Sequence, residues 1–93
     1  MISFDNSYAR ELSGFYSPYT PKPFPRPTLL RWNSDLADEL GLSLDGVSAE
    51  QLAQWFSGNE LPDGALPIAQ AYAGHQFGNF VPQLGDGRAL LLG

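Results

Sequence analysis

Three scarcities narrow what this chain can do before any pattern is considered. It has no cysteine, which excludes disulfide bonds and metal sites built on thiolates. It has a single histidine, His75, which excludes a zinc site built on several histidines. Basic residues are few: five lysines and arginines stand against ten acidic residues. The resulting net charge of -5 argues against a nucleic-acid partner, because proteins that bind nucleic acids usually have a basic face.

Long apolar runs are also missing. No stretch approaches the roughly 20 apolar residues that a membrane span needs, and residues 1–10 lack the basic start and apolar run of a secretory signal. We therefore expect a cytoplasmic protein with no membrane partner. The 93 residues allow one small domain, and the 43% of hydrophobic residues argue against a disordered chain.

The C-terminal residues are unusual for a complete protein. The sequence stops at Leu90, Leu91, Leu92 and Gly93, an apolar run that needs a partner surface. From this ending we expect the chain to be the N-terminal fragment of a longer protein.

Proline is concentrated in one segment. Five of the eight prolines lie between residues 18 and 27, a spacing that forbids a helix and favours an extended, polyproline-like chain. The aromatic residues before this segment show no clean period. We therefore predict that residues 1–32 form an extended aromatic and proline-rich arm, which serves as a stiff linker. The alternative is a ligand for a proline-binding domain.

Residues 33–70 are predicted to form a small helical segment that starts with a helix over 33–41. Asn33 or Ser34 can accept the hydrogen bonds that cap its start, and Gly41 fits the left-handed position after its end. The apolar side chains of this helix, Leu36 and Leu40, share one face.

A second helix is predicted over residues 48–57, because Ser48 and Gln51 match a capping box and Gly58 would stop the helix. The apolar stripe of this helix consists of Leu52, Trp55 and Phe56 and is interpreted as core.

After a loop, the segment 68–72 is predicted to be either a turn of helix or a short strand.

Residues 71–93 are predicted to form a β-hairpin, with strands 79–84 and 88–92 joined by the turn 85–87. Two glycines in that turn supply the positive φ angles that a tight hairpin needs. Pro82 has no amide donor, so we expect it at an edge or a bulge. The hairpin would have an unpaired edge, and we expect it to be poorly ordered in isolation. The fold class is therefore α+β.

The turn 85–87 is the best candidate for chemistry. Gly85 and Gly87 leave the backbone bare, so that its amides can approach a phosphate. Arg88 follows directly, and a guanidinium makes paired hydrogen bonds to phosphate. Glycine-rich loops of this kind cover the nucleotide in kinase-like folds. On this motif alone, a structural turn with Arg88 paired to Asp86 is the simpler interpretation.

No residue of the chain is predicted to be catalytic or to bind a metal. His75 could act as a general base, but a lone histidine between glycines is more often a structural hydrogen-bonding group. No serine or threonine shows a partner base, so a nucleophilic triad has no support. The acidic residues of the first predicted helix are interpreted as a solvated face: Asp35, Asp38 and Glu39.

The run from Ala71 to Ala89 strongly resembles the selenoprotein O family. That family has a near-fixed stretch of tyrosine, a small residue and Gly-His-Gln-Phe-Gly, followed by Gln-Leu-Gly-Asp-Gly-Arg. The first part is matched here by Tyr72–Gly78 and the second by Gln83–Arg88. Residues 1–60 resemble the family more loosely.

The resemblance implies a protein-kinase-like fold, of which this chain would be the start of the N-lobe. It implies transfer of AMP from ATP, bound with Mg or Mn in a flipped orientation, to serine, threonine or tyrosine hydroxyls of protein substrates. Gly85, Gly87 and Arg88 match the family's ATP-contacting positions, while Gln83 and Asp86 are expected to shape the turn. The family's catalytic and metal-binding residues would lie beyond residue 93.

We therefore expect the parent protein to be a protein adenylyltransferase and the 93-residue chain to be inactive alone, since it lacks the base and the metal ligands. Two alternatives remain open. In one, the chain is a protein-interaction or structural module in which the glycine turn is only a turn. In the other, the parent is an ordinary kinase that transfers the γ-phosphate.

Overall fold

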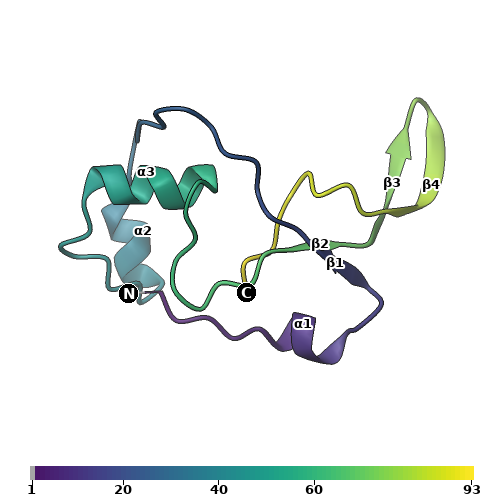
Figure 1. Cartoon of the computed structure of the whole chain (residues 1–93), viewed down its shortest axis with the longest axis horizontal. Coiled ribbons are helices and arrows are strands. Elements are labelled where there is room, and N and C mark those ends of the chain that lie inside the picture. Colours follow the sequence, from purple (N-terminus) through teal and green to yellow (C-terminus); the bar gives the residue numbers. More distant parts are fainter. Residues whose placement is uncertain (1) are drawn as a thin grey trace. The chain divides into compact units, whose positions relative to one another are not determined.

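The structure, a computed structural model, describes residues 2–93 and divides them into two compact units. One unit holds Lys22–Gly64 with the residues up to Ser3, and the other holds Phe4–Pro21 and Ala65–Gly93. Short helices and two small antiparallel sheets confirm the α+β class (Figure 1). No helix in the part of the chain that the structure describes is long and apolar enough to cross a membrane.

The first unit contains the two predicted helices. Helix α2 spans Ser34–Glu39, and the Asn33 side chain caps it by accepting a hydrogen bond from the Leu36 amide at 2.9 Å. Helix α3 spans Ala49–Ser57, and Ser48 Oγ accepts from the Gln51 amide at 3.1 Å. Both predicted N-terminal caps are thereby confirmed.

The capping box at the start of α3 is only half formed. A complete box would have the Gln51 side chain donate back to the Ser48 backbone. Instead, Gln51 Nε2 donates to Glu60 Oε2 at 2.9 Å, which ties the start of α3 to the chain that follows it. At its other end, α3 stops at Gly58, whose φ of 82° is the left-handed conformation predicted there.

The core of this unit is small, and the predicted apolar stripe contributes less to it than expected. Leu52 is buried, but Phe56 is 60% exposed and packs instead against Trp32, with ring centroids 5.7 Å apart. The shared face of Leu36 and Leu40 is also largely exposed. The buried side chains are Ala37, Leu44, Leu52, Ala53 and Pro62.

The proline segment has no helix or strand over residues 19–33, and it bends near Arg26, which has a positive φ of 47°. It is also held in place. The Phe24 amide donates to Asn59 Oδ1 at 2.7 Å, and Asn59 Nδ2 donates back to the Phe24 carbonyl at 2.6 Å. These paired bonds attach the segment just beyond the end of α3.

Two elements of the second unit lie within the range predicted as an extended arm. Helix α1 spans Ser7–Glu11, and strand β1 spans Tyr16–Pro18. The strand β2, Ile68–Gln70, pairs antiparallel with β1 in a register that sets Pro18 opposite Ile68 (Figure 1). The segment 68–72 therefore begins as a strand, which settles one of the open questions from the sequence.

β2 has a second partner on its other edge. The Ile68 amide donates to the Leu91 carbonyl at 3.0 Å, and the Leu91 amide donates to the Ile68 carbonyl at 3.1 Å. Because β2 lies between two chain segments, Ile68 and Ala69 are each only 2% exposed. They form the core of this unit.

The hairpin exists, but its turn is not where the sequence predicted it. Strands β3, Tyr72–Gln76, and β4, Asn79–Leu84, are joined at Phe77 and Gly78. These two residues have φ of 52° and 80°, the pair of positive angles of a type I′ turn. The predicted pairing of 79–84 with 88–92 is wrong, because the chain after β4 returns to β2.

Pro82 lies at an irregularity of the hairpin, as expected. Tyr72 pairs with Leu84 and Gly74 pairs with Val81, so that Pro82 and Gln83 together face the single residue Ala73. This extra residue on β4 is a β-bulge, which a proline tolerates because the ladder is interrupted there.

Candidate functional site

The candidate nucleotide turn follows β4 and is held by its own aspartate. Asp86 Oδ1 accepts a hydrogen bond from the Arg88 amide at 3.2 Å, so the side chain closes a tight turn over Gly87. Gly87 has a φ of 76°, a conformation that favours glycine. The predicted role of Asp86 in shaping the turn is confirmed, whereas Gln83 is exposed on β4.

A second donor reaches the same carboxylate oxygen from another strand. The Tyr72 hydroxyl, at the start of β3, donates to Asp86 Oδ1 at 3.2 Å. The pKa of Asp86 is lowered, chiefly by the bond from the Arg88 amide and also by the Tyr72 hydroxyl. The pKa of Tyr72 is raised, first by desolvation and then by the bond to Asp86. The carboxylate is therefore held in its charged form between two donors.

The two glycines of the turn have different surroundings. A Cβ added to Gly87 would lie 3.1–3.2 Å from three atoms of the Tyr19 ring, which is closer than ordinary contact. A Cβ added to Gly85 would meet nothing within 4 Å. The packing and backbone conformation of the chain thus favour glycine at position 87, while the backbone at Gly85 is open to a ligand.

Arg88 carries the positive charge of the site. Its side chain is exposed, and none of the ion pairs found in residues 2–93 involves it. The simpler interpretation, a surface pair between Arg88 and Asp86, is not what the structure has, because the backbone amide of Arg88 makes that contact. The guanidinium remains available for an anion.

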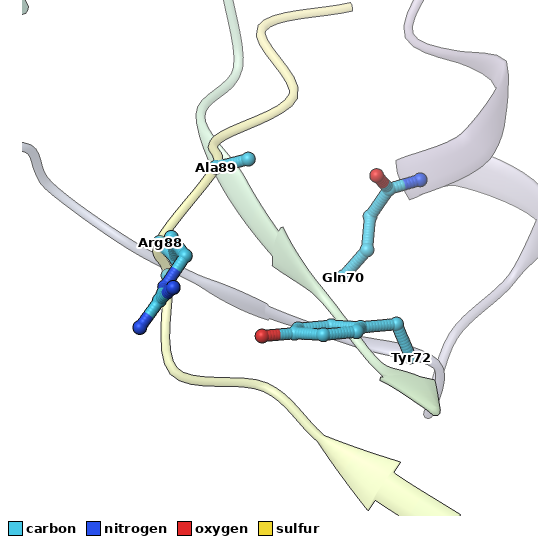
Figure 2. Close-up of a pocket in the computed structure, with 5 residues that line it drawn as sticks. Gln70, Tyr72, Arg88 and Ala89 are labelled. Atoms are coloured by element: carbon cyan, nitrogen blue, oxygen red, sulfur yellow. The ribbon is translucent and has the colours of Figure 1, made fainter. Parts of the chain in front are cut away.

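A hollow of about 290 Å³ lies beside this turn (Figure 2). Figure 2 shows the Tyr72 ring extending from the start of β3 toward the segment that carries Arg88. Ligand pockets usually enclose about 300–1,000 Å³, so this hollow lies near the lower end of that range. The lining residues are Gln70, Tyr72, Gly87, Arg88 and Ala89.

The other candidates from the sequence were His75 and the acidic residues. His75 is exposed on β3, and its ring packs across the hairpin against Phe80 with centroids 5.5 Å apart. Residues 2–93 contain no group of three or more histidines and acidic residues close enough to hold a metal ion.

Sequence reasoning missed the two tyrosines of the site. Tyr72 is part of the family motif, but the motif indicates no role for it, because only its position in β3 brings its hydroxyl to Asp86. Tyr19 carries no signal in the sequence, since its contact with Gly87 depends on how β1 is placed in the unit.

Comparison with known proteins agrees with the motif and extends it. The family model described as "Protein adenylyltransferase SelO" matches residues 1–93, including the first 60 residues that resembled the family only loosely. The chain is 66% identical over 90 residues to a protein of Cereibacter sphaeroides (strain ATCC 17025) named "Protein nucleotidyltransferase YdiU". That alignment covers 97% of this chain and 18% of the relative.

Proteins of the same name in two other bacteria are also similar. The one from Sphingopyxis alaskensis is 58% identical over 92 residues, which are 99% of this chain and 19% of the relative. The one from Rhizobium meliloti is 57% identical over 90 residues, which are 97% of this chain and 18% of the relative. The chain thus spans about a fifth of the length of these relatives. Matched over its whole length, it belongs to the SelO family.

Proposed function

We propose that this chain is the N-terminal part of an ATP-dependent protein adenylyltransferase and that its turn over residues 85–88 contacts ATP. The observation that carries the proposal is the free guanidinium of Arg88, next to the open backbone of Gly85, in a turn that Asp86 holds in shape. Membership of the SelO family supports the type of reaction.

In the proposed reaction, a serine, threonine or tyrosine hydroxyl of a protein substrate attacks the α-phosphorus of ATP. A new P–O bond forms to the hydroxyl oxygen, the bond from the α-phosphorus to the bridging oxygen breaks, and pyrophosphate leaves. The hydroxyl proton passes to a general base. Negative charge builds up on the phosphoryl oxygens, so positioned donors stabilise the transition state.

The residues of this chain have a binding role in that scheme. Arg88 would make charge-assisted hydrogen bonds to phosphate oxygens, and the amides near Gly85 and Gly87 would approach the same group. A bound Mg or Mn ion would neutralise phosphate charge. We propose that the metal ligands and the base lie outside residues 1–93, within a protein-kinase-like fold, so that the isolated chain has no transferase activity.

A cytoplasmic location is part of the same proposal. An alternative is a protein-interaction module, which is favoured by the exposed aromatic side chains of the hairpin: Phe77 is 100% exposed and Phe80 62%. The proline segment gives this alternative less support, since Asn59 already holds it through paired hydrogen bonds.

The test uses the full-length protein that carries this chain. It is incubated with magnesium, a protein acceptor and ATP labelled at either the α- or the γ-phosphate. We expect label on the acceptor from the α-position only. Label from the γ-position alone would show an ordinary kinase, and no label from either would favour the interaction module.

The variant Arg88→Ala tests whether the turn takes part in that reaction. Loss of a charge-assisted bond to phosphate should lower kcat/KM about ten- to a hundredfold. Arg31→Ala, which removes an exposed arginine from the other unit, is the matched control and should leave transfer unchanged. Equal activity of the two variants would remove Arg88 from the nucleotide site.

A further inference from the structure

The Asp86 carboxylate is the one acidic group built into the turn, and its position matters to any phosphate bound there. A carboxylate near a phosphate repels it, and a carboxylate near a guanidinium competes for it. Asp86 and Arg88 are only two residues apart, yet they form no ion pair among the residues that the structure describes. The Arg88 charge still attracts the carboxylate, since it is one of the causes that lower the pKa of Asp86, so a restraint that opposes their pairing would keep the guanidinium free.

The hydrogen bonds around Asp86 supply that restraint. Oδ1 accepts from the Arg88 amide and from the Tyr72 hydroxyl, both at 3.2 Å. The first bond is local and would form in many turns of this kind. The second comes from β3 and fixes the direction of the carboxylate relative to the sheet. Tyr72 itself is anchored, because it pairs with Leu84 at the base of the hairpin.

The opposite side of the turn is restrained by packing. The Tyr19 ring lies against Gly87, so closely that a methyl group at Gly87 would meet it at 3.1 Å. Tyr19 is in turn fixed by its amide, which donates to the Pro67 carbonyl at 3.2 Å. The backbone between Asp86 and Arg88 thus has little freedom to adjust if the carboxylate moves.

We propose that Tyr72 is a positioning residue for nucleotide binding: its hydroxyl holds the Asp86 carboxylate away from Arg88 and so keeps the Arg88 guanidinium free for the phosphates of ATP. This inference rests on the proposed function, since it assumes that Arg88 binds phosphate. Tyr72 acts through Asp86 and need not touch the nucleotide.

The direct test is Tyr72→Phe in the full-length protein, with the dissociation constants of ATP and adenosine measured by calorimetry. Without the hydroxyl, Asp86 loses one of its two donors and can turn toward the guanidinium. We expect ATP binding to weaken about three- to tenfold, while adenosine, which has no phosphate, binds as before. Equal weakening for both ligands would indicate a merely structural role and would overturn the proposal.

Tyr16→Phe is the matched control. The Tyr16 hydroxyl donates to the Ala9 carbonyl at 2.6 Å, so this variant also removes one hydroxyl and one hydrogen bond from the same unit, but away from the turn. It should leave the affinity for both ligands unchanged. If Tyr16→Phe weakens ATP binding as much as Tyr72→Phe does, the effect is general and the proposal fails.

A double-mutant cycle shows whether the effect passes through Asp86. In an Asp86→Ala background there is no carboxylate to restrain, so adding Tyr72→Phe should change ATP affinity little. A full Tyr72→Phe effect in that background would mean that Tyr72 contacts the nucleotide itself, which contradicts the proposed route.

The variant Arg88→Ala distinguishes a failure of the inference about Tyr72 from a failure of the proposed ATP site. If Arg88→Ala weakens ATP binding and Tyr72→Phe does not, the inference about Tyr72 is wrong and the proposed site stands. If Arg88→Ala also leaves ATP binding unchanged, the proposed site itself is wrong, and the inference falls with it.

Discussion

Strand β2 and the β3–β4 hairpin follow one another along the chain but are stabilised very differently. β2 pairs with β1 on one edge and with Leu91 on the other, and two of its residues are 2% exposed. The two hairpin strands pair only with each other, and every hairpin residue is at least partly exposed. Stability is therefore concentrated in β2, while the exposed hairpin provides the tyrosine that reaches the candidate site.

Ile68→Ala should produce the largest loss of stability in this comparison. Ile68 is 2% exposed, and truncating a buried isoleucine costs about 2–5 kcal/mol. Phe77→Ala, at the fully exposed tip of the hairpin, should change the free energy of unfolding by no more than about 0.5 kcal/mol. Urea unfolding followed by NMR measures both variants. Similar losses would mean that the hairpin and β2 contribute equally.

Gly87→Ala should have the next largest effect. Alanine is strained at a φ of 76°, which costs about 1–2 kcal/mol, and its methyl group would press on the Tyr19 ring. Gly85→Ala is the matched control, because space around Gly85 is open. We expect a clear loss of stability from the first variant and almost none from the second. A large loss from Gly85→Ala would show that its backbone is also constrained.

Phe77→Asn should stabilise the hairpin by about 1 kcal/mol. Phenylalanine is uncommon at a φ of 52°, whereas asparagine followed by glycine is the preferred pair of a type I′ turn. Amide exchange of Asn79–Leu84 is expected to be fast in the natural chain and slower in the variant. Strong protection already present in the natural chain would contradict our prediction that the hairpin is poorly ordered by itself.

The smallest expected effect is on the pH dependence of stability. The pKa of Asp86 is lowered from 3.8, so its contribution to stability is present above that value and is lost as the pH falls through the lower, folded-state pKa. The pKa of Tyr72 is raised from 10.0, so its contribution is complete below 10.0 and is lost as the pH rises through the folded-state pKa.

An NMR titration can follow the Asp86 carboxyl directly. In Tyr72→Phe its pKa should move up toward 3.8, since one of its donors is gone. An unchanged pKa in this variant would show that the hydroxyl contributes little to holding the carboxylate.

Local features of the fold were predictable from the sequence, and non-local ones were not. The caps at Asn33 and Ser48 depend on residues three positions away, so the pattern alone is sufficient. The hairpin turn was misplaced because Gly85 and Gly87 match the usual turn chemistry, whereas Phe77 does not. The pairing of the final residues with β2 depends on distant chain, which no local pattern reports.

The candidate site shows the same division. Arg88 and the two glycines could be identified from residue type and from the family resemblance. The restraint on Asp86 could not, because Tyr72 lies on another strand and its hydroxyl meets Asp86 only after β3 and β4 pair. Tyr19 is more remote still, and its contact with Gly87 requires β1 to pair with β2.

The pairing of Ile68 with Leu91 makes the chain between them a closed loop whose two ends are fixed on one strand. Length changes at the far tip, around Phe77 and Gly78, would extend or shorten the hairpin without displacing the ends, and longer loops cost little in closure entropy. A single residue inserted between Arg88 and Leu91 would instead shift the whole turn relative to β2. Natural and engineered variation in length should therefore be tolerated at the tip and excluded from the return segment.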